Sequence, residues 1–152
     1  MSTRRVSVGS DSHIINGRLL TAFAHEDCVV HEFSEDISAM VKGKNGNTII
    51  TYHPQGEFCK SVYKILRGSD DHAFLLNLKS AYQADPAGFV LLTGESTKVI
   101  GDGSGNRGNN SLNFSAGTFR KFSGMKDNAS GDPTQAVVEF EITWGEVVET
   151  IS

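Results

Sequence analysis

The glycine-rich stretch at residues 101–110, GDGSGNRGNN, has the residue types and spacing of a phosphate-binding loop. Within it, GSGNRG matches the GxGxxG pattern, which holds a dinucleotide pyrophosphate where a strand leads directly into a helix. The residues that follow, NNSLNFSAGTF, are polar and then β-like, without the apolar spacing of a helix. The pattern therefore predicts a loop between two strands rather than a nucleotide site.

The same loop offers oxygen atoms at alternate positions, as a calcium site requires. Asp102, Ser104 and Asn106 are spaced like the first ligands of an EF-hand loop. That loop needs glycine at its sixth position and glutamate at its twelfth, where this chain has Arg107 and Asn113. Because an arginine is a poor neighbour for a cation, we do not predict a calcium site.

Other candidate motifs fail on geometry. The segment GKNGNT, residues 43–48, places its lysine before the second glycine and so is not a P-loop. His25, Cys28 and His31 have the composition of a metal site, but an odd separation along a strand sends Cys28 and His31 to opposite faces. We find no GxSxG motif and no Ser, His and acid grouping. The sequence predicts no cofactor, no metal and no catalytic residue, and hence no enzyme.

Composition narrows the class of protein further. A chain of 152 residues is long enough for one buried core, so we expect a single domain over residues 1–152. The 14 basic residues against 18 acidic ones give a formal charge of -4, which argues against a surface that neutralises nucleic-acid phosphates. The apolar runs are too short to predict a signal peptide or a membrane span. Two cysteines, Cys28 and Cys59, favour a reducing compartment.

Short runs rich in Val, Ile, Phe and Thr predict strands separated by tight turns. Asn16-Gly17 lies between apolar pairs, which is typical of a two-residue hairpin turn, and a second Asn-Gly, Asn45-Gly46, precedes a predicted strand. The strands that we expect lie at about residues 28–33, 48–53, 58–68, 89–92, 112–122 and 136–144.

A helix is predicted at residues 70–84. Ser69 is a suitable N-cap, Asp70 and Asp71 favour the positive end of the helix dipole, and Pro86 prevents continuation. The apolar residues of this segment recur at helical spacing, so one stripe should pack on the sheet; they are Phe74, Leu75, Leu78 and Tyr82.

The last predicted strand alternates between apolar and polar residues. Val138, Phe140, Ile142 and Trp144 share one face, and the other face carries Val137, Glu139, Glu141 and Thr143. A sheet with one buried and one solvated face is therefore expected. Many strands and one helix predict a mainly β (α+β) fold, an antiparallel β-sandwich or barrel with one flanking helix.

Several segments in order resemble the tail tube proteins of contractile-tailed bacteriophages. The matching pieces are INGR with LLTAFAHED, then VKGKNGNTIITYHPQGEF, then KILRGSDDHAFLLNL, and finally the alternating strand AVVEFEITW. Together they cover most of the chain, and none of them is catalytic.

The resemblance implies a structural protein of the virion tail that assembles in the host cytoplasm. Such subunits form hexameric rings whose sheets join into a continuous barrel, and the rings stack into a tube through which genomic DNA is ejected without specific binding. The implied partners are copies of the chain itself and the sheath, baseplate and tail terminator proteins, with no membrane. The alternatives are the tube of a phage-derived contractile injection system or bacteriocin and, in another class, a small β-barrel ligand-binding domain or enzyme.

On this interpretation several polar residues become candidate contacts with neighbouring copies. The segment from Val41 to Gly56, and the loop at 101–110, would meet another subunit or ring through the residues Lys42, Lys44, Asn45, Asp102, Asn106 and Arg107. Glu139 and Glu141 are candidate lumen residues, because acidic side chains would repel DNA phosphates. The alternatives are a solvated hairpin tip and a solvated face, with Lys60 and Lys64 offsetting the acids.

Overall fold

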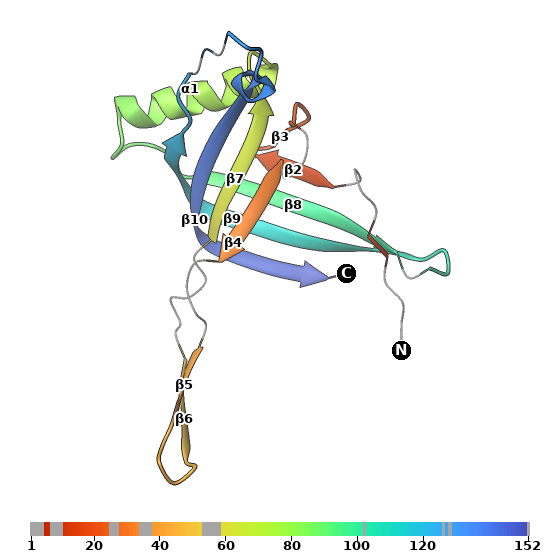
Figure 1. Cartoon of the computed structure of the whole chain (residues 1–152), viewed down its shortest axis with the longest axis vertical. Helices are drawn as coiled ribbons and strands as arrows, with labels where there is room; N and C mark the ends of the chain where they lie inside the picture. Colours follow the sequence, from red (N-terminus) through yellow and green to blue (C-terminus); the bar gives the residue numbers. More distant parts are fainter. Residues whose placement is uncertain are drawn as a thin grey trace.

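The computed structural model describes residues 5–6, 11–24, 28–33, 38–52, 59–101, 103–125, 127 and 129–151. These residues form antiparallel strands and one α-helix (Figure 1). The elements, in chain order, are β1 (Arg5–Val6), β2 (Ser12–Ile15), β3 (Arg18–Leu19), β4 (Val29–Phe33), β5 (Ser38–Lys42), β6 (Thr48–Tyr52), β7 (Cys59–Leu66), α1 (Asp70–Ala84), β8 (Leu92–Gly101), β9 (Arg107–Phe122), a 3-10 turn (Pro133–Ala136) and β10 (Val137–Ile151).

Two sheets are present among the described strands. The larger has the order β3-β2-β8-β9-β10-β7-β4, with β1 also paired to β8, and the smaller is the β5–β6 pair alone. Strand β10 is central: its first part pairs with β7, and β9 follows it from Phe140 to Ile151. Figure 1 shows β7 and β4 crossing steeply over the long strands β8 and β9, so the sheet folds back over itself as a sandwich does.

The core lies inside this fold and is centred on Trp144 of β10, which is fully buried. Its indole stacks on Phe114 of β9 with ring centroids 5.0 Å apart, and its Nε1 donates to Ser61 Oγ of β7 at 2.9 Å. Gly94 of β8 and Gly117 of β9 lie against the same ring, and a Cβ at Gly117 would collide with it. The glycines therefore allow β8 and β9 to approach the tryptophan closely.

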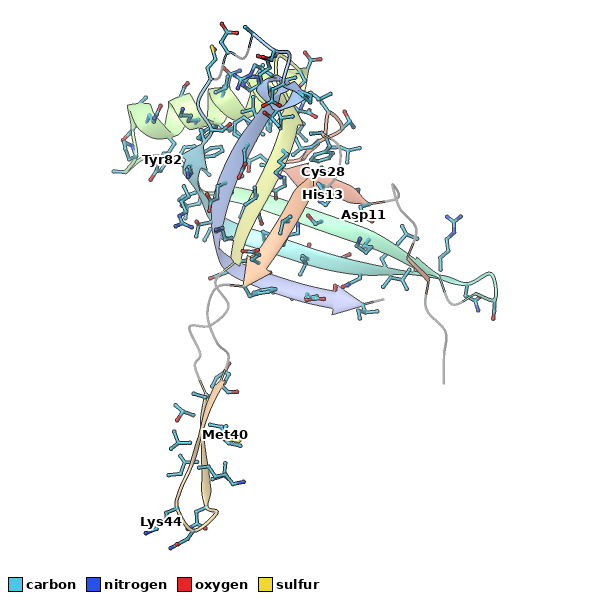
Figure 2. All side chains as sticks on the ribbon, viewed as in Figure 1. Asp11, His13, Cys28, Met40, Lys44 and Tyr82 are labelled. Atoms are coloured by element: carbon cyan, nitrogen blue, oxygen red, sulfur yellow. The ribbon has the colours of Figure 1, made fainter. Side chains whose placement is uncertain are left out.

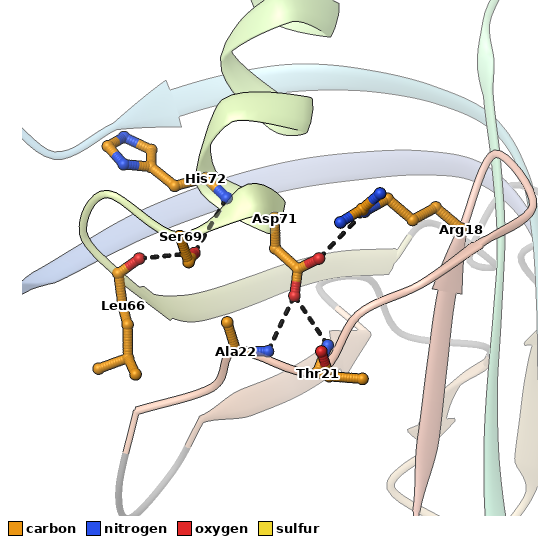
Figure 3. A network of polar contacts seen from close by, with 7 residues as sticks. All are labelled: Arg18, Thr21, Ala22, Leu66, Ser69, Asp71 and His72. Atoms are coloured by element: carbon orange, nitrogen blue, oxygen red, sulfur yellow. Dashed lines mark hydrogen bonds and ion pairs between the residues drawn. The ribbon is translucent and has the colours of Figure 1, made fainter.

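The helix is anchored to the sheet through its first turn (Figure 3). Ser69 caps α1 by accepting from the His72 amide at 3.2 Å. The buried carboxylate of Asp71 accepts from the Thr21 and Ala22 amides, both at 2.8 Å, and pairs with Arg18 at 3.0 Å. Burial alone would raise the pKa of Asp71, but these amides and the guanidinium outweigh it and lower the pKa. The helix start is thus fixed to the segment after β3.

The structure confirms the mainly β fold with one flanking helix. The helix spans Asp70–Ala84 with Ser69 as N-cap, and Asn16-Gly17 forms a turn with positive φ at both residues. Of the helix stripe, Leu75 is fully buried, and Phe74, Leu78 and Tyr82 pack against the core. The described strands do not close into a barrel, because β4 and β3 end the sheet order.

Three strand predictions were wrong in extent. The strand predicted at 89–92 begins only at Leu92 and continues to Gly101, while Val90 is 84% exposed. Strand β9 begins at Arg107, five residues before the predicted start, and β10 runs on to Ile151. These extensions are polar or lack alternation, and ladder pairing between the long strands holds them in β-conformation.

Filling the space at Gly117 should destabilise the folded chain. We expect G117A to lower the free energy of unfolding by about 2 kcal/mol or more, because the new Cβ meets the Trp144 ring and Leu92 and overpacks the core. The measurement is urea unfolding followed by tryptophan fluorescence. The matched control is G124A, since nothing lies within 4 Å of a Cβ at Gly124. Equal midpoints for both variants would contradict the central role of this contact.

Candidate assembly surface

The β5–β6 hairpin, residues 38–52, projects from the rest of the chain (Figure 1). Its strands pair with each other and with no other described strand. Met40 lies opposite Ile50, and Val41 lies opposite Ile49. Since neighbouring residues of a strand point to opposite sides, these two pairs occupy opposite faces of the ribbon.

Both faces of this hairpin are apolar and both are exposed. The large apolar side chains are each at least 64% exposed; they are Met40, Val41, Ile49, Ile50 and Tyr52. An isolated two-stranded hairpin is marginally stable in water, and a solvated ribbon normally carries polar residues on at least one side. The composition of the hairpin therefore fits a segment that is covered on both faces by another molecule.

The hairpin tip brings together one group of the predicted contact residues. Lys42 ends β5, and Lys44 and Asn45 belong to the turn, where Gly46 has a φ of +87°. The Gly43 amide donates to the Asn47 carbonyl at 2.6 Å, which closes the turn. Asn45-Gly46 lies at the tip of a hairpin, within a five-residue connection between Lys42 and Thr48 rather than a two-residue turn. Lys42 and Lys44 place positive charge beside the exposed apolar pairs, with Met40 and Lys44 labelled in Figure 2.

The second predicted group lies elsewhere in the fold. Gly101 ends β8 and Arg107 begins β9, where the two residues face each other, so the connecting loop is shorter than the ten residues 101–110. Gly103 and Gly105 take positive φ, as expected of a tight loop. Asn106 lies in this loop, and Asp102 is outside the described residues. The loop joins two strands directly, which confirms that GSGNRG does not lead into a helix.

Alternation in β10 placed Glu139 and Glu141 together on a solvated acidic face, and the structure corrects this picture. Glu141 is only 8% exposed, and its Oε1 binds Lys60 Nζ at 3.0 Å and Arg120 Nη1 at 3.1 Å. Glu139 is exposed and lies opposite Lys64 of β7. The face therefore has paired charges of both signs, because β7 and β9 contribute cations beside the acids of β10.

A partly buried chain of polar side chains connects the two halves of the folded sheet. His31 of β4 contacts Ser61 Oγ at 2.6 Å through Nδ1 and Ser96 Oγ of β8 at 2.8 Å through Nε2. His13 of β2 contacts the same Ser96 Oγ at 2.8 Å. Burial, with a smaller contribution from the nearby His13, lowers the pKa of His31 to about 4, and burial also lowers the pKa of His13. Both histidines are thus neutral hydrogen-bonding groups at neutral pH.

Sequence reasoning considered His31 only as a metal ligand beside Cys28, and His25 of that trio lies outside the described residues. The partners that it does contact are tens of residues away in the chain, and no local pattern connects them. Among the described residues, no three His, Cys, Asp or Glu side chains are placed to hold a metal ion. In that part of the chain, no helix has the length and apolar character needed to cross a membrane.

Comparison with known proteins shows the fold. No protein-family model and no curated protein matches the chain. A chain of the sheath–tube complex of an extracellular contractile injection system, PVC, in its extended state has a TM-score of 0.68 at 12% identity, covering 97% of this chain and 93% of that one. The sheath/tube terminator of the same system has a TM-score of 0.67 at 13% identity, and the match covers 96% of each chain.

A third solved structure, the tube-terminating cap of the anti-feeding prophage, has a TM-score of 0.67 at 8% identity and covers 97% of this chain and 92% of that one. At such low identity these matches establish a common fold over nearly the whole chain. The mainly β architecture predicted from the sequence is therefore one that contractile injection systems use.

The His31 contacts predict a loss of stability in acid. The unfolded imidazole takes up a proton near pH 6.5 and the folded one only near pH 4, so the unfolded state binds more protons between these values. The free energy of unfolding should fall by roughly 3 kcal/mol from this residue as the pH drops from 7.5 to 4. Chemical denaturation across this range should show that the free energy of unfolding changes less with pH in H31Q than in the unchanged protein. Identical slopes would contradict the assignment.

Proposed function

We propose that this chain is the structural subunit of the inner tube of a contractile particle and that it assembles with copies of itself rather than catalysing a reaction. The observation that carries the proposal is the β5–β6 hairpin, whose two exposed apolar faces are uncovered by the described residues. The fold likeness to chains from sheath–tube and tube-terminator structures supports the same assembly.

Free strand edges offer the contacts within a ring. Strand β4 pairs only with β7 among the described strands. The pairing of β10 with β7 ends at Trp144, so residues 145–151 of β10 have β9 as their described partner on one side. Exposed edges are an aggregation hazard unless another strand pairs with them. Pairing between copies that closes into a ring would satisfy these edges, and six copies is the number that the phage resemblance implies.

The hairpin offers the contact between rings. It projects well beyond the sheet, so it reaches a different copy from the one that pairs with the strand edges (Figure 1). A contact between two different surfaces generates an open filament when the rotation between copies does not close into a ring. In this proposal Lys42, Lys44 and Asn45 meet the next ring. The loop residues Asp102, Asn106 and Arg107 remain candidates for a second contact, and the exposed Glu139 remains a candidate for the lumen. Glu141 does not, because it is buried against Lys60 and Arg120.

The kind of particle is the finer part of the proposal. The resemblance in sequence pointed to a phage tail, whereas the solved structures described above belong to an extracellular contractile injection system and to the anti-feeding prophage. We favour the injection-system alternative on these matches, with sheath and tube-terminator proteins as partners. The mixed charge beside Glu141 also removes the reason to expect a lumen specialised to repel DNA.

Assembly can be tested directly. Purified protein at high concentration, imaged by negative-stain electron microscopy, should show rings or stacked tubes with a central channel. Class averages viewed down the tube would give the number of subunits in a ring. Compact monomers at every concentration and ionic strength tried would contradict the proposal.

Charge reversal at the hairpin tip provides a separate test. We expect K42E/K44E to shorten the tubes, because two cations of the proposed contact become anions, while the subunit fold survives since both side chains are exposed. Tube length is measured by electron microscopy and the fold by circular dichroism. The matched control is K121E, which reverses an exposed lysine on β9 away from the hairpin. Unchanged tube length in K42E/K44E would show that the hairpin tip is not part of the contact between rings.

A further inference from the structure

A groove of about 570 Å³ lies between the second half of α1 and the segment that leads into β8. Its lining is mostly apolar and includes Leu78, Ala81, Asp85, Phe89, Val90 and Leu91. The turn before β3 holds one edge in place, because Asn16 bonds to Thr93 through both its backbone amide and its side chain. The groove is therefore a fixed feature of the folded subunit.

The groove is apolar where a solvated surface would be polar. Val90 is 84% exposed and Leu91 is 47% exposed, and neither lies in a strand. Phe89 packs edge-on against Tyr82 of α1, with ring centroids 5.1 Å apart, and this contact holds the Phe89 side chain against the helix. Covering these side chains would remove apolar surface from water, which favours a partner on this surface.

The charge around the groove is negative. Asp85 is its one charged residue among the described lining residues, and it follows the end of α1. The last turn of the helix has no basic residue to offset the negative end of its dipole. Lys79, earlier on the helix, lies over the Phe122 ring at 4.3 Å. One Asp85 oxygen accepts from the Gly88 amide at 3.1 Å. The groove thus suits an apolar segment that carries a cation.

One face of the β5–β6 hairpin has this chemistry. Met40 and Ile50 lie opposite each other on it, and Lys42 follows on the same side because it is two residues from Met40. An apolar pair beside a single cation complements an apolar groove beside a single anion. The positions also fit: α1 and Tyr82 lie at one end of the long axis and Met40 and Lys44 at the other (Figure 2).

We propose that the α1–β8 groove receives the β5–β6 hairpin of a second copy of this chain, with Met40 and Ile50 against Val90 and Leu91 and Lys42 beside Asp85. The inference rests on the proposed function and names the surface that the hairpin meets. Because the groove and hairpin lie at opposite ends, each copy offers a groove to one neighbour and a hairpin to the next. Such a contact passes from each copy to the next, and it builds an open stack when the rotation between copies does not close into a ring.

A charge swap tests the pairing. D85K and K42D should each shorten tubes several-fold, because each places like charges together, and the double variant D85K/K42D should recover a large part of the length. The matched control is D127K, which makes the same charge change at an exposed residue outside the groove lining. Tubes of full length in D85K would overturn the proposal and leave the groove for another partner, such as a sheath protein.

Crosslinking tests proximity without relying on the Asp85 hydrogen bond that D85K also removes. A V90C protein is mixed with an I50C protein and treated with a short bismaleimide, and a covalent dimer containing one of each is expected. The control is M125C in place of V90C, since Met125 is 85% exposed and lies outside the groove lining. Equal yields from both mixtures, in samples that form tubes, would overturn the groove contact and leave the tube proposal standing. Absence of tubes from the unchanged protein would overturn both.

Discussion

The packing of Trp144 sets the geometry on which the rest of the fold depends. Its ring fills the space between β10 and the two glycines, Gly94 and Gly117, and its Nε1 is satisfied by Ser61. A buried tryptophan needs a partner for its Nε1, and close packing leaves no room for a Cβ at Gly117 where the ring lies. The indole therefore lies across β9 and β8, which are the next two strands of the sheet after β10.

The polar contacts extend this arrangement outward from the tryptophan. Ser61 also contacts His31, whose other nitrogen contacts Ser96, so β4 is tied to β8 across the interior, although they are not neighbours in the sheet. Asp71 in turn fixes the start of α1 to the segment after β3. As a result the helix, with the groove along its second half, is held at one end of the subunit, and the hairpin extends from the other (Figure 1).

Local sequence patterns predicted the strands and the helix, but they could not predict the tertiary contacts. Asn16-Gly17, the Ser69 cap and the alternation from Val138 to Trp144 depend on neighbours in the sequence, and each is confirmed. The lengths of β8 and β9 depend on ladder partners, so a polar start such as 107–111 gave no signal. The burial of Glu141 was missed because Lys60 and Arg120 come from other strands. The hairpin was predicted, but its exposure depends on the absence of a covering strand, which no local pattern encodes.

The exposed hairpin is the feature on which the proposed assembly depends. Each large apolar side chain left in water forgoes about 2 kcal/mol relative to burial, and the hairpin leaves such residues on both faces. A single partner surface could cover only one face, so complete burial requires a second surface on the opposite side. In a stacked tube, the ring that receives the hairpin and an adjacent subunit can supply both. The free energy that the isolated subunit does not recover thus becomes available to hold rings together.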